Sequence, residues 1–125
     1  MPESPFLKAL DAGEALREEP LAFVIADGHP VTPGHSLICP KRPVRDFFQL
    51  TEPEWRAIRE LIHLRASDLR VEDPSITGFN IGMNCGEAAG QTVMHCHVHL
   101  IPRRDGDTPA PRGGVRGVIP DKQSY

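Results

Sequence analysis

The stretch VMHCHVHLI, residues 93–101, places a histidine at every second position and fills the gaps with apolar residues or cysteine. Alternate side chains of a strand stand on one face, about 6.6 to 6.8 Å apart, so the pattern predicts a strand with three imidazoles along one side. An exposed strand face usually carries mixed polar residues, and three histidines without threonine, lysine or glutamate predict a chemical site instead. By the same alternation Cys96 faces the apolar side, as an inert core thiol.

Further strands are predicted on both sides of this stretch. The runs LAFVIA, residues 21–26, and SLIC, residues 36–39, are β-rich and stop at turn residues. Residues 77–84 alternate between large apolar side chains and small or polar ones, which predicts another strand, with Ile81 on its apolar side.

One long helix is predicted between the two groups of strands. Thr51 and Glu54 form a capping box, apolar residues then recur at helical spacing, and Pro74 ends the pattern, so the helix covers about residues 52–71. Its opposite face is predicted to be solvated charge and includes Asp68. Residues 1–20 are expected to form a short helix and a loop.

Length and composition indicate one ordinary domain. The 125 residues are expected to fold as a single unit, 1–125, in which residues 102–125 form an irregular segment rich in proline and glycine. A net charge of -3 provides no overall positive field, so we expect neither nucleic acid nor an anionic membrane as a partner. Three cysteines without a C-x-x-C pair, and no long apolar run, predict a cytoplasmic protein.

The histidine row permits two kinds of chemistry. Two of its imidazoles could bind zinc together with His35 or His29. The preceding glycines, with Gln91 and Thr92, instead resemble a phosphate cradle with exposed N–H groups, which favours phosphate. A neutral imidazole can then attack phosphorus, if an acceptor such as a main-chain carbonyl holds its second nitrogen and other donors offset the phosphoryl charge. The middle histidine, His97, is the best placed for this role.

Two segments resemble a known family. GQTVMHCHVHLIPR, residues 90–103, resembles the signature of the histidine triad family, in which histidines alternate with apolar residues. DGHPVTPGHSLICPKRPVRDFFQLTEPEW, residues 27–55, resembles the first strand pair of that family. The sequence of these segments is nearer to the fragile histidine triad branch, which consists of dinucleoside polyphosphate hydrolases, than to the nucleotide-binding phosphoramidases.

The resemblance implies a fold, a reaction and a set of site residues. It implies an α+β homodimer with a five-stranded antiparallel sheet that cleaves purine nucleotides of the form AMP-X at the α-phosphorus. His97 would become adenylylated, His99 would contact the α-phosphate and the leaving-group side, and His35 and His95 would complete the imidazole network. The substrate would be bound at the ribose by Asp27, at the phosphates by Asn84, Gly90, Gln91 and Thr92, and at the base by Ile25 and Leu37.

Some alternatives remain open from the sequence. The paired cysteines that bind zinc in some members of the family are absent, so no structural metal is expected, and no cofactor either. A divalent ion would enter only with a polyphosphate substrate. The runners-up are an adenosine phosphoramidase, a non-catalytic nucleotide sensor and a zinc enzyme. Basic residues near the end are either distal phosphate ligands or solvated: Arg103, Arg104, Arg112 and Arg116. His29 and His63 have no periodic partners and are interpreted as non-catalytic.

Overall fold

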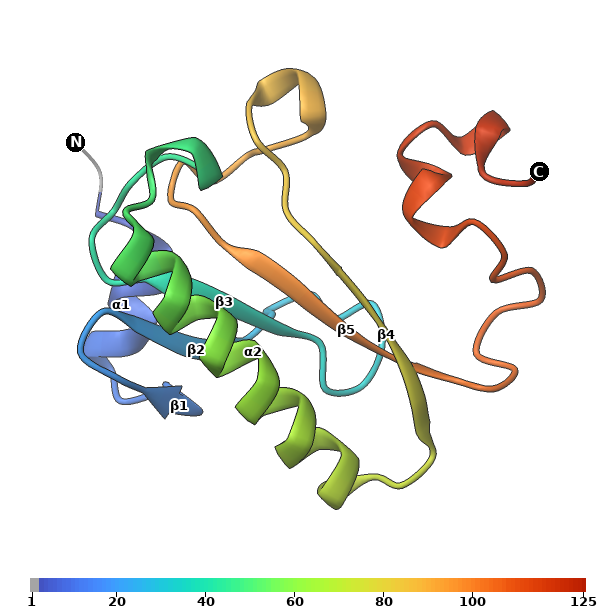
Figure 1. The fold of residues 1–125 in the computed structure, drawn as a ribbon, viewed down its shortest axis with the longest axis horizontal. Helices are drawn as coiled ribbons and strands as arrows, with labels where there is room; N and C mark the ends of the chain where they lie inside the picture. Colours follow the sequence, from blue (N-terminus) through green and yellow to red (C-terminus); the bar gives the residue numbers. More distant parts are fainter. Residues whose placement is uncertain (1–2) are drawn as a thin grey trace.

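A computed structural model describes residues 3–125 of the chain (Figure 1). Its centre is one antiparallel sheet with the strand order β1-β2-β3-β5-β4. The strands are β1 Arg17–Glu18, β2 Ala22–Ala26, β3 Ser36–Pro40, β4 Ile76–Gly82 and β5 Val98–Arg104. Residues 3–125 also contain two α-helices, α1 Pro5–Asp11 and α2 Glu52–Glu72, and four short 3-10 helices. The predicted α+β class, the five-stranded antiparallel sheet and both helices are confirmed.

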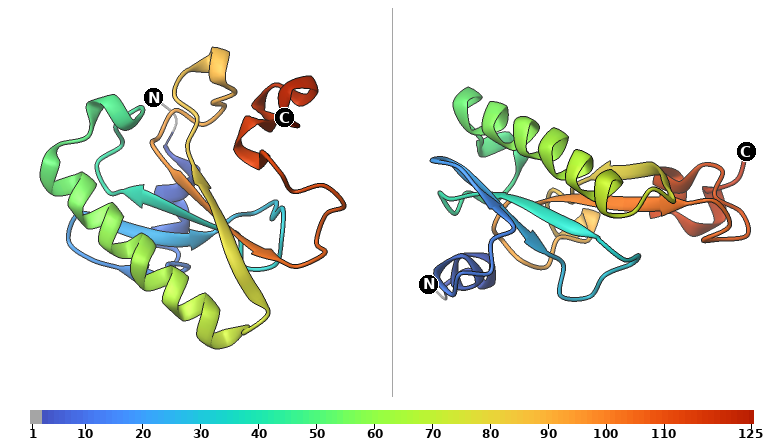
Figure 2. Two further views of the ribbon diagram at one scale, coloured as in Figure 1. Left: turned by 45° about the vertical axis from the view of Figure 1, so that its right-hand side comes forward. Right: turned by 90° about the horizontal axis from the view of Figure 1, so that it is seen from below.

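The two helices cover opposite faces of the sheet, as the view from below in Figure 2 shows. Because strand side chains alternate, each strand contributes to two separate cores. Val24 and Ile38 pack under α2 with Ile58 and Leu61. On the other face α1 contributes to a second cluster, which contains Phe6, Phe23, Ile25, Leu37 and Cys39. The central strands β2 and β3 are therefore buried on both sides.

Helix α2 begins where the capping box predicts. The Glu54 N–H donates to the Thr51 hydroxyl at 3.3 Å, and the Thr51 N–H donates to the Glu54 carboxylate at 2.9 Å. The helix runs one residue past the predicted end, to Glu72. One charge on its outer face is not simply solvated, because Asp68 accepts two hydrogen bonds from Arg17 of β1, at 2.7 and 2.9 Å.

The strand predicted over residues 93–101 is wrong in its first half. Strand β5 begins only at Val98, and residues 93–97 are irregular. Over that segment the chain leaves the β3 ladder, and the Cys96 N–H donates to the carbonyl of Val44 instead. The same strand continues to Arg104, so the first three residues of the segment predicted to be irregular belong to the sheet.

The rest of the C-terminal segment folds back beside the outer strand β4 (Figure 2). It contains two 3-10 turns, η3 Gly114–Val118 and η4 Pro120–Lys122. The predicted apolar face of β4 is incomplete, because Ile81 is 51% exposed next to this segment. Within residues 3–125 no helix combines the length and the apolar character needed to cross a membrane.

Candidate active site

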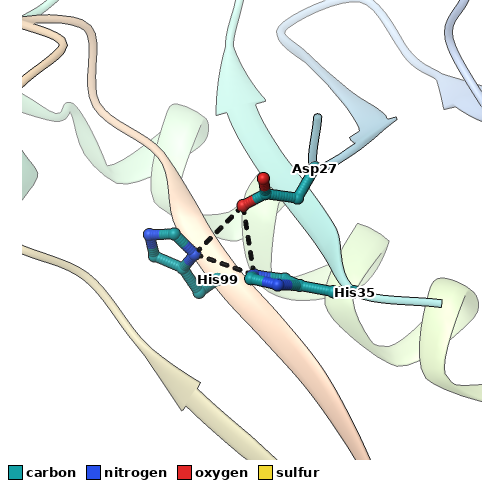
Figure 3. A group of neighbouring side chains, drawn as sticks. All are labelled: Asp27, His35 and His99. Atoms are coloured by element: carbon teal, nitrogen blue, oxygen red, sulfur yellow. Dashed lines mark hydrogen bonds and ion pairs between the residues drawn. The ribbon is translucent and has the colours of Figure 1, made fainter. Parts of the chain in front are cut away.

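A carboxylate and two imidazoles meet where β2, β3 and β5 lie side by side (Figure 3). Asp27 follows β2, His35 precedes β3, and His99 lies in β5 opposite Leu37. His35 Nε2 lies 2.9 Å from His99 Nδ1. Asp27 Oδ2 lies 3.3 Å from His35 Nε2 and 3.7 Å from His99 Nδ1. The His35 side chain is 3% exposed and that of His99 is 26% exposed, so His99 is the ring that a ligand can reach.

Asp27 has partners at both carboxylate oxygens. One oxygen accepts the His29 N–H at 2.7 Å, and the other faces the two imidazoles. The family resemblance implies that Asp27 binds the ribose. To do so, Asp27 must accept hydrogen bonds at carboxylate lone pairs that these contacts leave free. The sequence offered no carboxylate near the histidine row, because the chain folds over about 70 residues to bring Asp27 to His99.

His97 is held at one ring nitrogen. Its Nδ1 lies 2.7 Å from the main-chain carbonyl oxygen of His95, which makes Nδ1 the donor and leaves the lone pair on Nε2. Within residues 3–125, no hydrogen-bond partner of Nε2 is found. The ring of His99 lies beside it, with centroids 5.2 Å apart, and the ring of Phe6 packs edge-on against it at 4.7 Å. The sequence predicted that a main-chain carbonyl would orient His97, and this contact is present.

His95 stands apart from the other imidazoles. Its ring is 1% exposed, its Nε2 lies 2.7 Å from the carbonyl oxygen of Pro40, and its Nδ1 lies 2.6 Å from the hydroxyl of Ser4. The ring is therefore an anchor within the fold and does not face the site. The main-chain carbonyl of His95, in contrast, accepts the hydrogen bond that orients His97.

Sequence reasoning missed Ser4 and Phe6. Both come from the first turn of α1, where Ser4 also accepts the Phe6 N–H at 3.2 Å as the helix N-cap. The pair Ser4-Pro5 is a helix-start signal that could have placed this helix. Nothing local indicates that it packs against residues more than 85 positions away.

Burial shifts the titration of three of the imidazoles. Removal from water lowers the pKa of His35, His95 and His99, because burial disfavours the charged ring. Asp27 opposes this effect at His35 and His99, while the neighbouring rings of His97 and His35 add to it at His99. These three rings are therefore neutral at neutral pH, and each has one donor and one acceptor nitrogen.

The predicted phosphate cradle differs in its details from the expectation. Gly90 adopts a positive φ of 92°, and Thr92 is exposed, so both can be approached from solvent. Gln91 is 4% exposed, and its amide is used by the loop itself. It accepts the Gly86 N–H at 2.8 Å and donates to the carbonyls of Arg45 and Val93. Gln91 thus shapes the loop, and its side chain is not directed at a ligand.

A cavity of about 490 Å³ opens beside His99. Its walls come from β4, β5, the C-terminal segment and the turn that carries Val31 and Thr32, and they include Asn84, one of the predicted phosphate contacts. The lining is mostly apolar, with Ile81, Val115 and Val118 among its members. The predicted base wall, Ile25 and Leu37, lies outside this cavity in the α1 core, each 5% exposed.

The four arginines that the sequence offered as distal phosphate ligands have partners within the chain. Arg103 binds Asp107 through two nitrogens, at 2.8 and 2.7 Å, and Asn80 through a third. Arg104 binds Asp73, and Arg112 and Arg116 both stack on the ring of Tyr125. The side chains of His29 and His63 are exposed, and His29 contacts Asp27 through its main-chain N–H.

Comparisons with known proteins agree with this geometry. The family model described as HIT domain matches residues 12–106. A bis(5'-adenosyl)-triphosphatase of Dictyostelium discoideum is 39% identical over 87 residues, which is 70% of this chain and 58% of the relative. A bifunctional bis(5'-adenosyl)-triphosphatase/adenylylsulfatase of Arabidopsis thaliana is 32% identical over 98 residues, 78% of this chain and 54% of the relative.

The fold has a close counterpart among solved structures. The crystal structure of a HIT family protein from Bacillus anthracis superimposes with a TM-score of 0.75 at 34% identity, over 83% of this chain and 75% of that one. The chain spans little more than half the length of the two curated relatives described above.

Proposed function

Since the chain belongs to the histidine triad (HIT) family, we propose that it is a nucleotidyl hydrolase that cleaves AMP-X compounds at the α-phosphorus. The relatives from D. discoideum and A. thaliana support this proposal, because both names describe enzymes that act on adenosine 5'-phosphate derivatives. The observation that carries it is the 2.7 Å contact between His97 Nδ1 and the His95 carbonyl. That contact directs the lone pair of Nε2 away from the protein backbone, as a nucleophile requires.

In the proposed first step His97 Nε2 attacks the α-phosphorus. The bond from phosphorus to X breaks, X leaves with the bonding electrons, and a nucleotidyl-histidine remains. The proton on Nδ1 stays hydrogen-bonded to the His95 carbonyl, which stabilises the positive charge that the substituted ring acquires. Water then attacks phosphorus, the electron pair of the N–P bond returns to Nε2, a proton is released, and AMP departs.

His99 is the proposed donor to the substrate. Its ring lies beside that of His97, and it is more exposed than His35, which holds it from behind. A donor at this position offsets the charge that develops on the phosphoryl oxygen and on the departing oxygen of X. Asn84 and the Gly90–Thr92 loop are proposed to contact the phosphates.

The cavity beside His99 supports a dinucleoside polyphosphate as the substrate. At about 490 Å³ it has room for a leaving group of nucleoside size, and its walls are mostly apolar. Its one arginine, Arg103, is already neutralised by Asp107. A small dianion such as sulfate would gain little there, whereas a base and sugar would fill the space.

A second copy of the chain is the proposed partner. Strand β4 is the last strand of the sheet, so its outer edge pairs with no other strand of residues 3–125. The unpaired main-chain groups of an outer strand favour pairing with another chain. Light scattering during size-exclusion chromatography tests this proposal, and a mass of one chain at micromolar concentration would refute it.

The three free cysteines support a reducing, cytoplasmic location.

A substrate panel tests the proposed activity. Diadenosine triphosphate, adenylyl sulfate and adenosine phosphoramidate are incubated separately with the protein, and AMP is quantified. We expect AMP from all three and the highest kcat/KM with diadenosine triphosphate. Rapid acid quenching with labelled substrate should trap label on His97, and His97→Ala should abolish both label and turnover. His63→Ala, an exposed histidine on α2, is the matched control. Binding without AMP release would identify a sensor instead.

A further inference from the structure

The turn that leads into β3 carries a hydrogen bond that the proposed reaction does not use directly. The main-chain N–H of Val31 donates to His35 Nδ1 at 3.0 Å. A ring nitrogen that accepts from an N–H cannot carry a proton itself, because two donors would then face each other. His35 therefore carries its one proton on Nε2, and the doubly protonated ring is excluded for the same reason.

The tautomer of His35 determines the tautomer of His99. The proton on His35 Nε2 points at His99 Nδ1, which is 2.9 Å away. Since two N–H groups cannot approach this closely, His99 Nδ1 must accept, and the proton of His99 must lie on Nε2. Asp27 Oδ2 lies 3.3 Å from His35 Nε2 and is a negatively charged neighbour of the same N–H group.

The same three side chains would otherwise suit a metal ion. Their ligand atoms all lie within 4.8 Å of one another, and the three separations run from 2.9 to 3.7 Å. A tetrahedral zinc site with bonds of about 2.0 to 2.1 Å has ligand atoms roughly 3.3 Å apart, so the spacing fits. Zinc needs a lone pair on each ligand atom, however, and at His35 Nε2 that position is taken by a proton.

We propose that the Val31 N–H is a positioning group that sets the tautomers of His35 and then His99, and so keeps these two rings, beside Asp27, a hydrogen-bond relay that rejects divalent metal ions. Moving the His35 proton to Nδ1 would free Nε2 for zinc but would oppose it to the Val31 N–H. The relay delivers a fixed donor at His99 Nε2. Only the use of that donor on a phosphate rests on the proposed function; the tautomers and the metal rejection do not.

Nuclear magnetic resonance tests the tautomers in the unaltered protein. In protein labelled with ¹⁵N-histidine, two-bond proton–nitrogen correlations distinguish protonated from unprotonated ring nitrogens. We expect unprotonated Nδ1 and protonated Nε2 at both His35 and His99 at neutral pH. A protonated Nδ1 at His35 would overturn the proposal. A chain that hydrolysed none of the nucleotides tested would still give this spectrum, so the two proposals fail separately.

A proline variant removes the donor itself. Val31 is 70% exposed, so Val31→Pro deletes the N–H with little loss of packing, and Val31→Ala is the control that keeps the N–H. We expect mixed tautomers at His35 and His99 in Val31→Pro only. Titration with zinc chloride by calorimetry should show at least tenfold tighter binding to Val31→Pro than to the unaltered protein, and His35→Ala in the same background should remove this gain.

Three results would contradict the proposal. They are unchanged tautomers in Val31→Pro, equal zinc affinity with and without the N–H, and tight one-to-one zinc binding to the unaltered protein that His35→Ala abolishes. If Val31→Pro does not fold, as judged by circular dichroism, the spectrum of the unaltered protein and its zinc titration decide the question.

Discussion

The hydroxyl of Ser4 lies 2.6 Å from Nδ1 of His95, which joins the N-cap of α1 to the start of the histidine row. On the other side of the same ring, Nε2 donates to the Pro40 carbonyl at 2.7 Å. The ring is thus held at both nitrogens, and its main-chain carbonyl in turn orients His97. Helix α1 is therefore part of the scaffold that positions the proposed nucleophile.

Replacing this hydroxyl should affect both stability and turnover. Ser4→Ala removes an N-cap, which costs about 1 kcal/mol, and leaves a buried ring nitrogen unpaired, which costs about 1 to 3 kcal/mol more. We expect a lower Tm and a lower kcat with KM little changed, because the nucleophile is less well held. Ser67→Ala, at an exposed position of α2, should change neither. Equal behaviour of the two variants in calorimetry and kinetics would show that the contact is unimportant.

The nucleophile can be tested by chemical rescue. His97→Gly should lower kcat on the order of 10³-fold or more, since no other group can form the covalent intermediate. Added imidazole should restore part of the AMP release, because it can enter the space of the lost ring and donate to the His95 carbonyl. His63→Ala should be insensitive to imidazole. Wild-type turnover in His97→Gly would end the assignment of His97.

The glycine before His35 should not tolerate a side chain. Gly34 has a φ of 93°, and a Cβ there would lie 2.8 Å from Leu69 Cδ2 and 3.3 Å from Pro102 Cγ. Left-handed backbone costs about 1 to 2 kcal/mol and overpacking a similar amount, so Gly34→Ala should lower the free energy of unfolding by about 2 kcal/mol or more. Gly28→Ala has open space and should cost less than about 0.5 kcal/mol. Urea titration compares the two variants, and equal unfolding midpoints would contradict the predicted strain at residue 34.

The hydrogen bonds that Ser75 and Arg104 donate to Asp73 should make stability depend on pH. Hydrogen bonds from Ser75 and then Arg104 lower the pKa of Asp73 from 3.8 to about 2. A lowered folded-state pKa stabilises the fold above the unfolded value and loses this contribution as the pH falls. Tm should therefore fall between pH 4 and 2, and Asp73→Asn should flatten that decline. Asp11→Asn, at the exposed end of α1, is the control. If Tm of Asp73→Asn fell between pH 4 and 2 as much as that of the unaltered protein, Asp73 would not be the source of this pH dependence.

Two of the three thiols should be unreactive in the folded protein. Burial raises the pKa of Cys96 to about 12, and it raises the pKa of Cys39 well above its ordinary value. Because the thiolate is the reactive form, iodoacetamide at pH 8 should label only Cys85, which is partly exposed. Unfolding in urea should expose all three to labelling. Mass spectrometry that found Cys96 alkylated in the folded chain would contradict its burial.

Features set by neighbours in the chain were predictable from the sequence. The Thr51–Glu54 capping box, the helix it starts and the central strands all depend on contacts within a few residues, so periodicity and turn residues were enough. The carbonyl that orients His97 lies only two residues away, and it too could be expected. The strand predicted over residues 93–101 is wrong in its first half because alternation alone cannot tell that the main chain leaves β3 before Val98, where the Cys96 N–H donates to Val44.

The rest was decided by tertiary structure. The meeting of Asp27 with His35 and His99, the contact of Ser4 with His95 and the pairing of Arg17 with Asp68 all join segments far apart in the chain. Such contacts follow from how helices and strands pack, and no local pattern encodes them. The sequence alone predicted which side chains are suited to the proposed chemistry on phosphate. Packing decided which of them are buried anchors, which form the relay and which one is left with a free lone pair.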